Sequence, residues 1–172
     1  MMRDGSGREA EPVSSVRVSL VIPVFNFSGG IARTVSELNK FLDRFGDDLE
    51  DVIIDDGRTD DTVELISRRI HRNNMRLVCT TKNRGKGGAV KTGIVASRGE
   101  FVIFTDADLP YDLLVVDMML EKFGGGFDVV LGSRNLAGSI SEIAPNFKRT
   151  ALSFIYSWLA NRVVFAPVGD TQ

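Results

Sequence analysis

The sequence has very few of the side chains that form disulfides or bind transition metals. Its 172 residues include one cysteine, Cys79, and one histidine, His71. A single cysteine excludes an intrachain disulfide framework and a cysteine-based zinc cluster, and a single histidine excludes a histidine-rich metal site. Any metal that the chain binds must therefore be held by oxygen ligands, which favours Mg²⁺ or Mn²⁺.

Long apolar runs and an excess of one charge are also missing. With 21 basic and 23 acidic residues the formal net charge is −2, which gives no reason to expect nucleic acid as a partner. No stretch reaches the roughly 18 uncharged apolar residues of a transmembrane helix. The content of 43% hydrophobic and 26% charged residues is typical of a soluble globular protein of about one domain.

The two ends differ from the middle of the sequence. Residues 1–15 are polar and lack the apolar segment of a signal peptide, so we interpret them as a disordered leader. Residues 16–172 are interpreted as one domain. Because the sequence stops directly after an apolar run, we expect this domain to be incomplete at its C-terminus.

Alternating strand and helix patterns predict an α/β fold. Apolar, β-branched runs predict five strands: Val16–Ile22 (stopped by Pro23), Val52–Ile54, Arg76–Cys79, Phe101–Phe104 and Asp128–Gly132. Helical patterns lie at Ile31–Phe45, after Asp61, at Ala89–Ser97 and from Pro110 to about Phe123. Asp61 and Glu64 have the spacing of a capping box, and Cys79 is expected to be a buried small hydrophobe. The short links predict a mostly parallel, Rossmann-like sheet with helices on both faces.

Acidic residues follow two of the predicted strands. Asp55 and Asp56 end the second, and Asp106 and Asp108 end the fourth. Ligands of open α/β sheets bind beyond the carboxyl ends of the strands, and two carboxylates on one face suit Mg²⁺ or Mn²⁺ together with phosphate oxygens. Two structural alternatives stay open: Asp108 as the N-cap of the next helix, and Asp55–Gly57 as a plain turn.

A glycine-rich loop, Asn83–Gly88, precedes a helical pattern. Backbone N–H groups, Lys86 and a helix N-terminus are the parts of a phosphate cradle. The loop lacks the Ser or Thr that follows the lysine of a P-loop, and it lacks the third glycine of a dinucleotide fingerprint. A turn whose glycines serve close packing is an equally good interpretation of this loop alone.

Taken together, five ordered motifs resemble family 2 glycosyltransferases of GT-A fold, and most closely the polyprenyl-phosphate (dolichyl-phosphate) glucosyl- and mannosyltransferases. The motifs are Val21–Asn26, Asp55–Thr62, Asn83–Gly93, Asp106–Asp108 and Gly132–Arg134. The final residues, Gly169–Gln172, resemble the start of a further motif of that group. The resemblance covers residues 16–172, and it implies that they form a nucleotide-sugar-binding glycosyltransferase domain.

The resemblance also implies roles for individual residues. Pro23 and Phe25 would line the nucleotide base, and Asp56, with Asp55 beside it, would contact the base. Lys86 and Gly87 would border the nucleotide.

The ends of the fourth and fifth predicted strands would hold the diphosphate side of the donor. Asp106 would contact the ribose or the metal, and Asp108 would bind a Mg²⁺ or Mn²⁺ ion that bridges the diphosphate. Ala107 would belong to the substrate-binding set. Arg134 would reach toward the diphosphate or the acceptor phosphate, which makes Asp108 and Arg134 the expected catalytic residues.

Three positions depart from the family pattern. Phe27 stands where a glutamate is usual, Arg58 replaces the serine after Asp-Asp-Gly, and Pro110 replaces a metal-binding glutamine of some mannosyl relatives. Phe27 removes a polar contact with the nucleotide and Pro110 removes a metal ligand that the resemblance would otherwise imply.

The implied reaction is inverting transfer of a hexose from UDP-glucose or GDP-mannose to a polyprenyl phosphate. A phosphate monoester is already largely ionised near neutrality because its second pKa is about 6, so no dedicated general base is required. Residues 133–165 carry four basic residues and one acidic residue, which suits an anionic membrane surface as well as an ordinary covering helix. The expected location is cytoplasmic, with peripheral attachment to the cytoplasmic face of a membrane as the alternative.

Other functions stay open at this point. One is a family 2 enzyme that transfers sugar to a hydroxyl group in polysaccharide or glycolipid synthesis, and another is a donor-binding fragment without turnover. A sugar-nucleotide pyrophosphorylase fits less well because its N-terminal glycine-rich signature is missing.

Overall fold

The computed structural model describes residues 16–132, and the chain divides into two compact units, Met1–Met118 and Met119–Gln172. The first unit holds all the strands of the described part. No helix among the described residues is both long enough and apolar enough to cross a bilayer.

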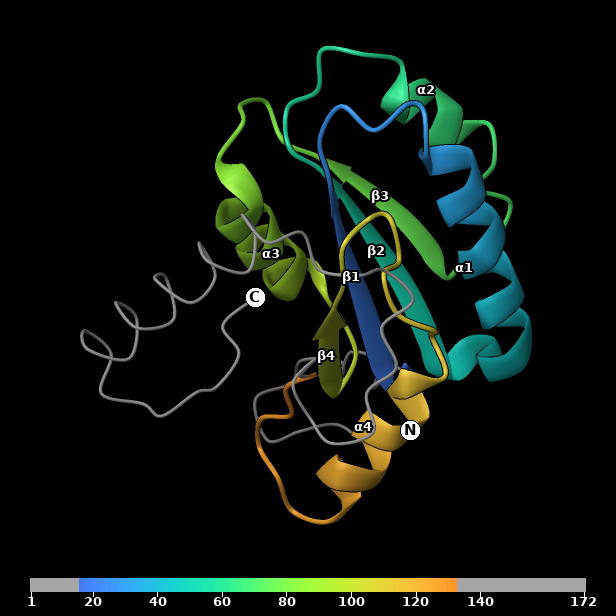
Figure 1. Ribbon diagram of the computed structural model, residues 1–172, viewed down its shortest axis with the longest axis vertical. Coiled ribbons are helices and arrows are strands. Elements are labelled where there is room, and N and C mark those ends of the chain that lie inside the picture. The colour runs from blue at the N-terminus through green and yellow to red at the C-terminus, as the bar shows by residue number, and fades with distance from the viewer. Residues whose placement is uncertain (1–15, 133–172) are drawn as a thin grey trace, which may run out of the picture. The chain divides into compact units, whose positions relative to one another are not determined.

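A parallel four-stranded sheet forms the centre of the first unit (Figure 1). Its strands are β1 (Val18–Val24), β2 (Leu49–Asp55), β3 (Met75–Cys79) and β4 (Phe101–Phe104), in the spatial order β3-β2-β1-β4. Every neighbouring pair is parallel, so all four carboxyl ends lie along one edge. The mostly parallel α/β arrangement predicted from the sequence is confirmed.

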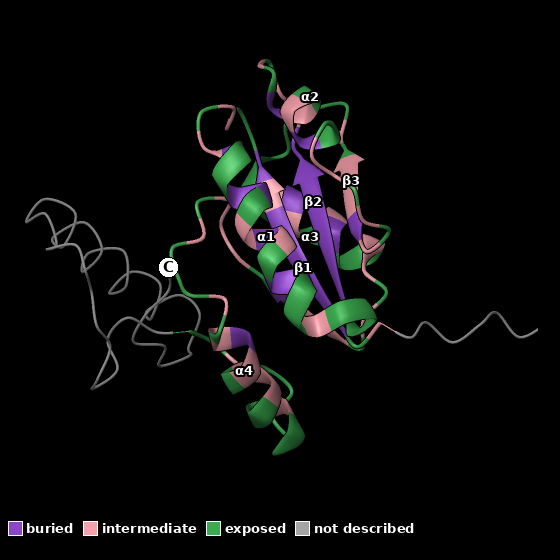
Figure 2. Ribbon diagram, turned by 90° about the vertical axis from the view of Figure 1, so that its right-hand side faces the viewer, coloured by how far each residue is buried: buried purple, intermediate pink, exposed green. Residues whose placement is uncertain are grey.

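Helices cover both faces of this sheet. α1 (Ile31–Phe45) and α2 (Thr62–Ser67) lie on one face, and α3 (Gly85–Ala96) lies on the other (Figure 1). The central strands β1 and β2 are almost entirely buried, and α1 turns its apolar side to them (Figure 2). This double cover explains why the strands contain runs of consecutive apolar residues, such as Leu20–Ile22 and Val52–Ile54, and do not alternate.

β1 runs through Pro23, where the sequence predicts its end. Pro23 pairs in register with Ile54 of β2, whereas the pairing with β4 stops at Val21 and Phe104. The amide hydrogen that proline lacks would point to the β4 side, because the carbonyl of Val21, two residues earlier, accepts the last bond from that side. The missing donor therefore costs no ladder hydrogen bond.

Two predictions near the end of the described part are wrong. Residues 128–132 form no strand, although their sequence is apolar. Val129 and Leu131 are highly exposed, so their β-branched and apolar character has no packed partner among the described residues. Helix α4 spans Val115–Gly124, and therefore begins five residues after Pro110.

The capping box and the buried thiol are also corrected. Asp61 precedes α2 but makes no side-chain capping bond, while Asp60 accepts the N–H of Thr62. Glu64 forms an ion pair with Arg58, so its carboxylate does not reach back to the helix start. Cys79 is exposed because it ends β3, an edge strand of the sheet.

A buried polar network ties the sheet together at its amino edge. Glu50 of β2 accepts hydrogen bonds from the hydroxyl of Ser19 and from the backbone N–H of Arg98, and it pairs with Arg76 of β3. The guanidinium of Arg76 also donates to the carbonyl of Ala96, the last residue of α3. The carboxylate is 1% exposed but well partnered, so its burial is compatible with stability.

Candidate functional site

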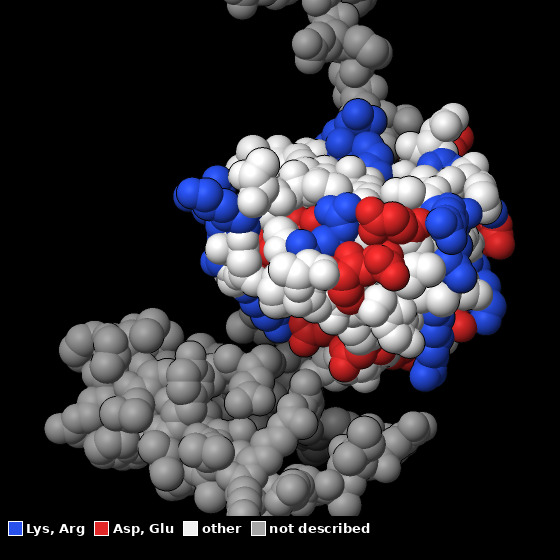
Figure 3. All heavy atoms as spheres, turned by 90° about the horizontal axis from the view of Figure 1, so that it is seen from above, with Lys and Arg blue, Asp and Glu red and all other residues white. Residues whose placement is uncertain are grey.

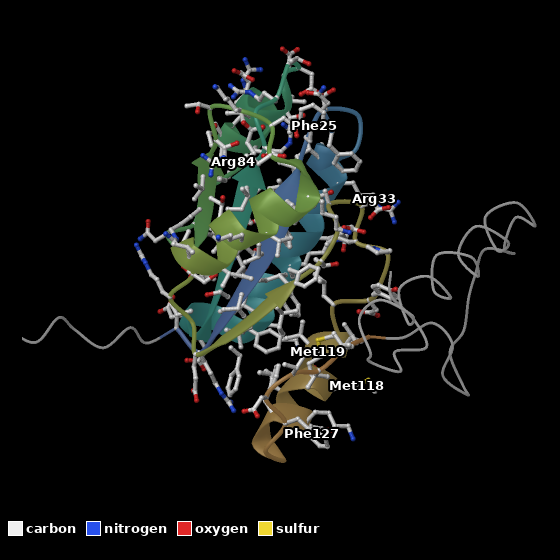
Figure 4. All side chains as sticks on the ribbon, turned by 90° about the vertical axis from the view of Figure 1, so that its left-hand side faces the viewer. Phe25, Arg33, Arg84, Met118, Met119 and Phe127 are labelled. Carbon is white, nitrogen blue, oxygen red and sulfur yellow. The ribbon has the colours of Figure 1, made fainter. Side chains whose placement is uncertain are left out.

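The predicted site residues gather at the carboxyl edge of the sheet. β2 and β4 both flank β1, so Asp55 and Asp56 on one side and Asp106 to Asp108 on the other are separated by a single strand. Viewed from this end, acidic and basic side chains lie together in the middle of the surface (Figure 3). Phe25 and Arg84 also lie at this end of the molecule (Figure 4).

A tight turn after β4 presents the two carboxylates. The N–H of Leu109 donates to the carbonyl of Asp106, 3.0 Å away, and Leu109 has a φ of 48°. A leucine in the left-handed region is strained, which indicates that the surroundings fix this turn. Asp108 is exposed and has no hydrogen bond or ion pair within residues 16–132, so its carboxylate is free to bind a ligand.

Lys86 reaches Asp106 from the first turn of α3. Its Nζ lies 2.6 Å from Oδ1 of Asp106, and the two side chains are 60% and 46% exposed. The sequence predicts both residues at the site but gives no sign that they pair. This ion pair connects the first turn of α3 with the turn after β4.

Asp56 holds the glycine-rich loop through the backbone. Both of its oxygens accept the N–H of Arg84, at 2.9 and 3.1 Å, and the residue is 3% exposed. Gly57 follows with a φ of 74°, and a Cβ there would lie 2.7 Å from the backbone nitrogen of Asn83. The Asp-Gly pair thus lets the loops after β2 and β3 pack against each other.

Asp55 is buried beneath Arg58. One oxygen of Asp55 lies 3.4 Å from the guanidinium, while the other is buried without a hydrogen-bond partner in the described part of the chain. Burial raises the pKa of the Asp55 carboxyl, and Arg58 counteracts part of that rise. Arg58, which the family pattern would make a serine, also pairs with Glu64 at 3.0 Å. It therefore supplies the positive charge that this buried carboxylate needs.

The remaining predicted residues lie on the same edge, with one exception. Pro23 is half-buried in β1, Phe25 is 46% exposed just after it, and Gly87 lies open to solvent in the first turn of α3. An exposed ring beside the buried end of a strand is available for stacking. Arg134 lies outside the described residues.

Three contacts at this edge come from residues that the sequence analysis did not single out. The hydroxyl of Thr34 in α1 donates to the carbonyl of Ala107, 2.6 Å away. Asn26, with a φ of 49°, and Thr59 exchange two hydrogen bonds, and Asp60 also accepts the N–H of Ser28. Thr34 lies on the apolar side of α1, and this position of a polar residue was the sequence signal that could have pointed to a buried hydrogen bond there.

The donor set fits a divalent cation that takes most of its ligands from elsewhere. No group of three or more acidic, His or Cys side chains suited to a metal occurs within residues 16–132. Asp106 and Asp108 supply two carboxylates, which is the usual protein share for Mg²⁺ or Mn²⁺ when phosphate oxygens and water complete the octahedron. The pair therefore fits a metal that arrives with a phosphate ligand.

An open depression lies at the other edge of the sheet. It is lined by Gly46, Asp47 and residues 71–74, which precede β2 and β3. Asn74 spans it by donating to the carbonyls of Gly46 and Leu49. These contacts close a loop junction, and none of the predicted site residues lies there.

Comparison with known proteins identifies relatives for most of the chain. Residues 19–160 match the family described as glycosyl transferase family 2. A dolichyl-phosphate beta-glucosyltransferase of Dictyostelium discoideum is 31% identical over 94% of this chain and 53% of its own length. A dolichol-phosphate mannosyltransferase of Pyrococcus furiosus is 27% identical over 78% of this chain and 38% of its own length. The chain thus spans about half or less of these relatives.

Solved structures share the fold of part of the chain. A mannosyltransferase of Pyrobaculum calidifontis, in complex with GDP-Man and Mn²⁺, is 32% identical over 54% of this chain and 27% of its own, with a TM-score of 0.50. TarS of S. aureus, in complex with UDP, is 26% identical over 54% of this chain and 28% of its own, also with a TM-score of 0.50.

Proposed function

Because this chain belongs to glycosyl transferase family 2, we propose that the site at the carboxyl edge of its sheet binds a nucleotide diphosphate sugar together with a divalent cation. The observation that carries the proposal is the turn after β4. It carries Asp106, which is paired with Lys86 of the first turn of α3, and Asp108, which has no partner within residues 16–132. Carboxylates for a cation and backbone N–H groups for a phosphate are what a cation-bound diphosphate needs.

Asp106 and Asp108 are the residues that would hold Mg²⁺ or Mn²⁺. When bound, the cation neutralises the negative charge that develops on the leaving diphosphate. The Mn²⁺ and GDP-Man of the Pyrobaculum structure support this assignment by similarity. Ala107 lies between the two aspartates in the sequence, and its carbonyl accepts a hydrogen bond from Thr34 of α1.

The base would lie on the β1 and β2 side of the same edge. Phe25 offers an exposed ring for stacking and Pro23 a half-buried apolar surface. Asp56 is assigned to the base by the family resemblance; it is 3% exposed, and Arg84 already donates to both of its oxygens. Asp55 is assigned to the same part of the site because it precedes Asp56. Gly87 has no side chain and open space around it, so the first turn of α3 leaves room for the ligand.

We further propose that the sugar, glucose or mannose, passes with inversion to a polyprenyl phosphate. The Dictyostelium and Pyrococcus relatives support this acceptor class. The acceptor phosphate is itself the nucleophile and is largely ionised near neutrality, so the described residues need not supply a base. Arg134 is assigned to a phosphate of either substrate. A lipid acceptor favours a place at a membrane surface, on its cytoplasmic face.

Calorimetry with the whole chain tests the donor site. UDP-glucose and GDP-mannose are titrated with and without Mn²⁺, and one of them should bind in a Mn²⁺-dependent way. Asp108→Asn should abolish the Mn²⁺-dependent part, while Asp112→Asn, a nearby exposed carboxylate outside the assigned set, should leave it unchanged. If neither sugar nucleotide binds in the presence of Mn²⁺, the proposal is wrong.

Transfer is tested separately with a short-chain polyprenyl phosphate as acceptor and a simple sugar alcohol as the competing acceptor. Labelled hexose on the lipid supports the proposed acceptor. Labelled hexose on the hydroxyl acceptor alone would indicate the other branch of the family. Donor binding without transfer to either would identify a donor-binding unit.

A further inference from the structure

We propose that Lys86 is a counter-ion for Asp106 when the site holds no ligand. The divalent cation displaces the ammonium group of Lys86 from Asp106, and this ammonium group then pairs with the diphosphate of the donor. The inference rests on the proposed function and concerns the order of events within that site. Its basis is the ion pair between Lys86 Nζ and Asp106 Oδ1, 2.6 Å long, which joins the first turn of α3 to the turn after β4.

The proposed site binds a cation and an anionic diphosphate, and Lys86 would affect both by competing with the cation for Asp106 and by attracting the diphosphate. Asp106 is a proposed cation ligand, so an ammonium group on its oxygen competes directly with the metal. The same ammonium is placed on the first turn of α3, where the N–H of Gly85 donates to the side chain of Asn83 and the positive end of the helix dipole favours an anion. A lysine is a compact charge on a flexible stem, which lets one side chain serve both positions.

Because the ion pair is exposed, breaking it costs little free energy. With side chains 60% and 46% exposed, Lys86 and Asp106 are screened by water, and such pairs contribute little to stability. Asp108 has no cationic partner in the described part of the chain, so a cation meets one free and one occupied carboxylate. The metal without nucleotide should therefore bind weakly, and the metal with a diphosphate should bind much better.

Lys91 provides a matched control. It lies on the same helix, is exposed, and has no ion pair within residues 16–132. Replacing Lys86 or Lys91 by methionine removes one positive charge from α3 in both cases. Only the Lys86 variant removes a group in contact with Asp106, so a general electrostatic effect is separated from the local one.

The experiment measures two affinities in wild type, Lys86→Met, Lys86→Arg and Lys91→Met. The first is the affinity for Mn²⁺ alone, followed by the loss of the free-ion electron paramagnetic resonance signal. The second is the affinity for UDP and for GDP at a fixed, saturating concentration of Mn²⁺, followed by calorimetry.

Opposite changes are expected for Lys86→Met. Its affinity for Mn²⁺ alone should rise by about two- to fivefold, the scale of an exposed ion pair, while its affinity for the nucleotide at saturating Mn²⁺ should fall by about threefold or more. Lys86→Arg should restore both values toward wild type because it keeps the charge, and Lys91→Met should change each by less than about twofold.

Three results would overturn the inference, and they separate it from the proposed function. If wild type binds nucleotide with Mn²⁺ but Lys86→Met shifts both affinities in one direction, or shifts neither, the exchange is wrong and the donor site stands. If Lys91→Met reproduces both changes, the effect is a general one of charge. If wild type binds Mn²⁺ under neither condition, the metal site and the exchange fail together.

Discussion

A buried hydroxyl, that of Thr34, helps to hold the turn that carries Asp106 and Asp108. Thr34 is 3% exposed, and its oxygen donates to the carbonyl of Ala107 over 2.6 Å. This contact joins α1 to a turn 73 residues later in the sequence. A hydrogen bond to the middle of the turn restrains the directions of both carboxylates without touching either.

Thr34→Val should therefore weaken Mn²⁺-dependent nucleotide binding while leaving the chain folded. Valine matches the shape of threonine but leaves the Ala107 carbonyl without this donor, at a cost of about 1 kcal/mol in the free energy of unfolding. Thr34→Ser, which keeps the hydroxyl, should retain affinity. Calorimetric titration and urea unfolding of both variants check this. Equal affinities for Thr34→Val and wild type would show that the turn holds without the bond.

Two carboxyl groups should make stability depend on pH in opposite directions. Asp51 is fully buried with neither oxygen hydrogen-bonded in the described structure, and burial, with the negative Glu50 beside it, raises its pKa well above the ordinary 3.8. Hydrogen bonds with Thr62 and Ser28 lower the pKa of Asp60 to about 2. The unfolded chain is expected to have the ordinary value at both positions.

The sign follows from which state binds the proton. Above pH 3.8 unfolded Asp51 loses its proton while folded Asp51 keeps it, so rising pH costs stability until the raised pKa is passed. Asp51→Asn should match wild type near pH 3.8 and become more stable than wild type as the pH rises. Asp60 contributes stability above pH 3.8 that disappears as the pH falls to about 2. Asp60→Asn should therefore be less stable than wild type above pH 3.8, and the difference should shrink below it.

Urea unfolding from pH 3 to pH 8 measures both effects. A constant difference between Asp51→Asn and wild type over this range would show that Asp51 is ionised in the folded state.

At the scale of the element, α3 depends on one glycine for its distance from the sheet. A Cβ on Gly93 would lie 2.2 Å from a methyl carbon of Val21 and 3.2 Å from a side-chain carbon of Ile54. Both neighbours belong to the buried cluster under α3. By contrast, a Cβ on Gly87 of the same helix would meet no atom within 4 Å.

Gly93→Ala should destabilise the protein by about 1–3 kcal/mol, because the helix must move outward or the valine must leave its rotamer. Gly87→Ala should stabilise it by about 0.5–1 kcal/mol, because alanine is the better helix former and no contact opposes it. Thermal and urea unfolding of the two variants compare these values directly. Gly93→Ala with wild-type stability would mean that α3 is not packed this closely.

The elements predicted from the sequence are those whose pattern does not depend on distant neighbours. The apolar side of Ile31–Phe45 is periodic and the runs at β2 and β4 are consecutive apolar residues, so each pattern is complete within its own segment, and the elements form as expected. The GT-A fold that the five motifs imply agrees with the solved relatives. Pro23 could not be placed without knowing that β4 ends early, and residues 128–132 are apolar whether or not a neighbour pairs with them.

The position of the candidate site was predictable from the sequence, but its hydrogen bonds and ion pairs were not. Strand ends in a parallel sheet meet at one edge, so the order of motifs is enough to bring Asp55, Asp56, Asp106 and Asp108 together. The pairing of Lys86 with Asp106 and the backbone role of Asp56 depend on loop geometry that no local pattern encodes. The same applies to the choice of Asp60 and not its neighbour as the cap of α2.

At the scale of the whole sheet, the two edges have different tasks. Glu50 joins β1, β2, β3 and the segment after α3 at the amino edge through buried, satisfied bonds. Asp108 at the carboxyl edge is exposed and contributes no bond within the described residues. The amino edge therefore stabilises the fold, and the carboxyl edge is left free to bind.

Glu50→Ala and Asp108→Asn should separate stability from binding in opposite ways. Removing the Glu50 carboxylate takes away the acceptor of the Ser19 hydroxyl and one of the acceptors of Arg76 and of the Arg98 N–H, which should lower the free energy of unfolding by about 2–3 kcal/mol. At a temperature where that variant is still folded, its Mn²⁺-dependent affinity for nucleotide should equal that of wild type, because none of the lost bonds reaches the carboxyl edge. Asp108→Asn should keep the wild-type free energy of unfolding and lose the affinity. Urea unfolding and calorimetry of both variants measure the four quantities. A loss of affinity in folded Glu50→Ala would show that the two edges are coupled through the strands, and the division of tasks between them would then be wrong.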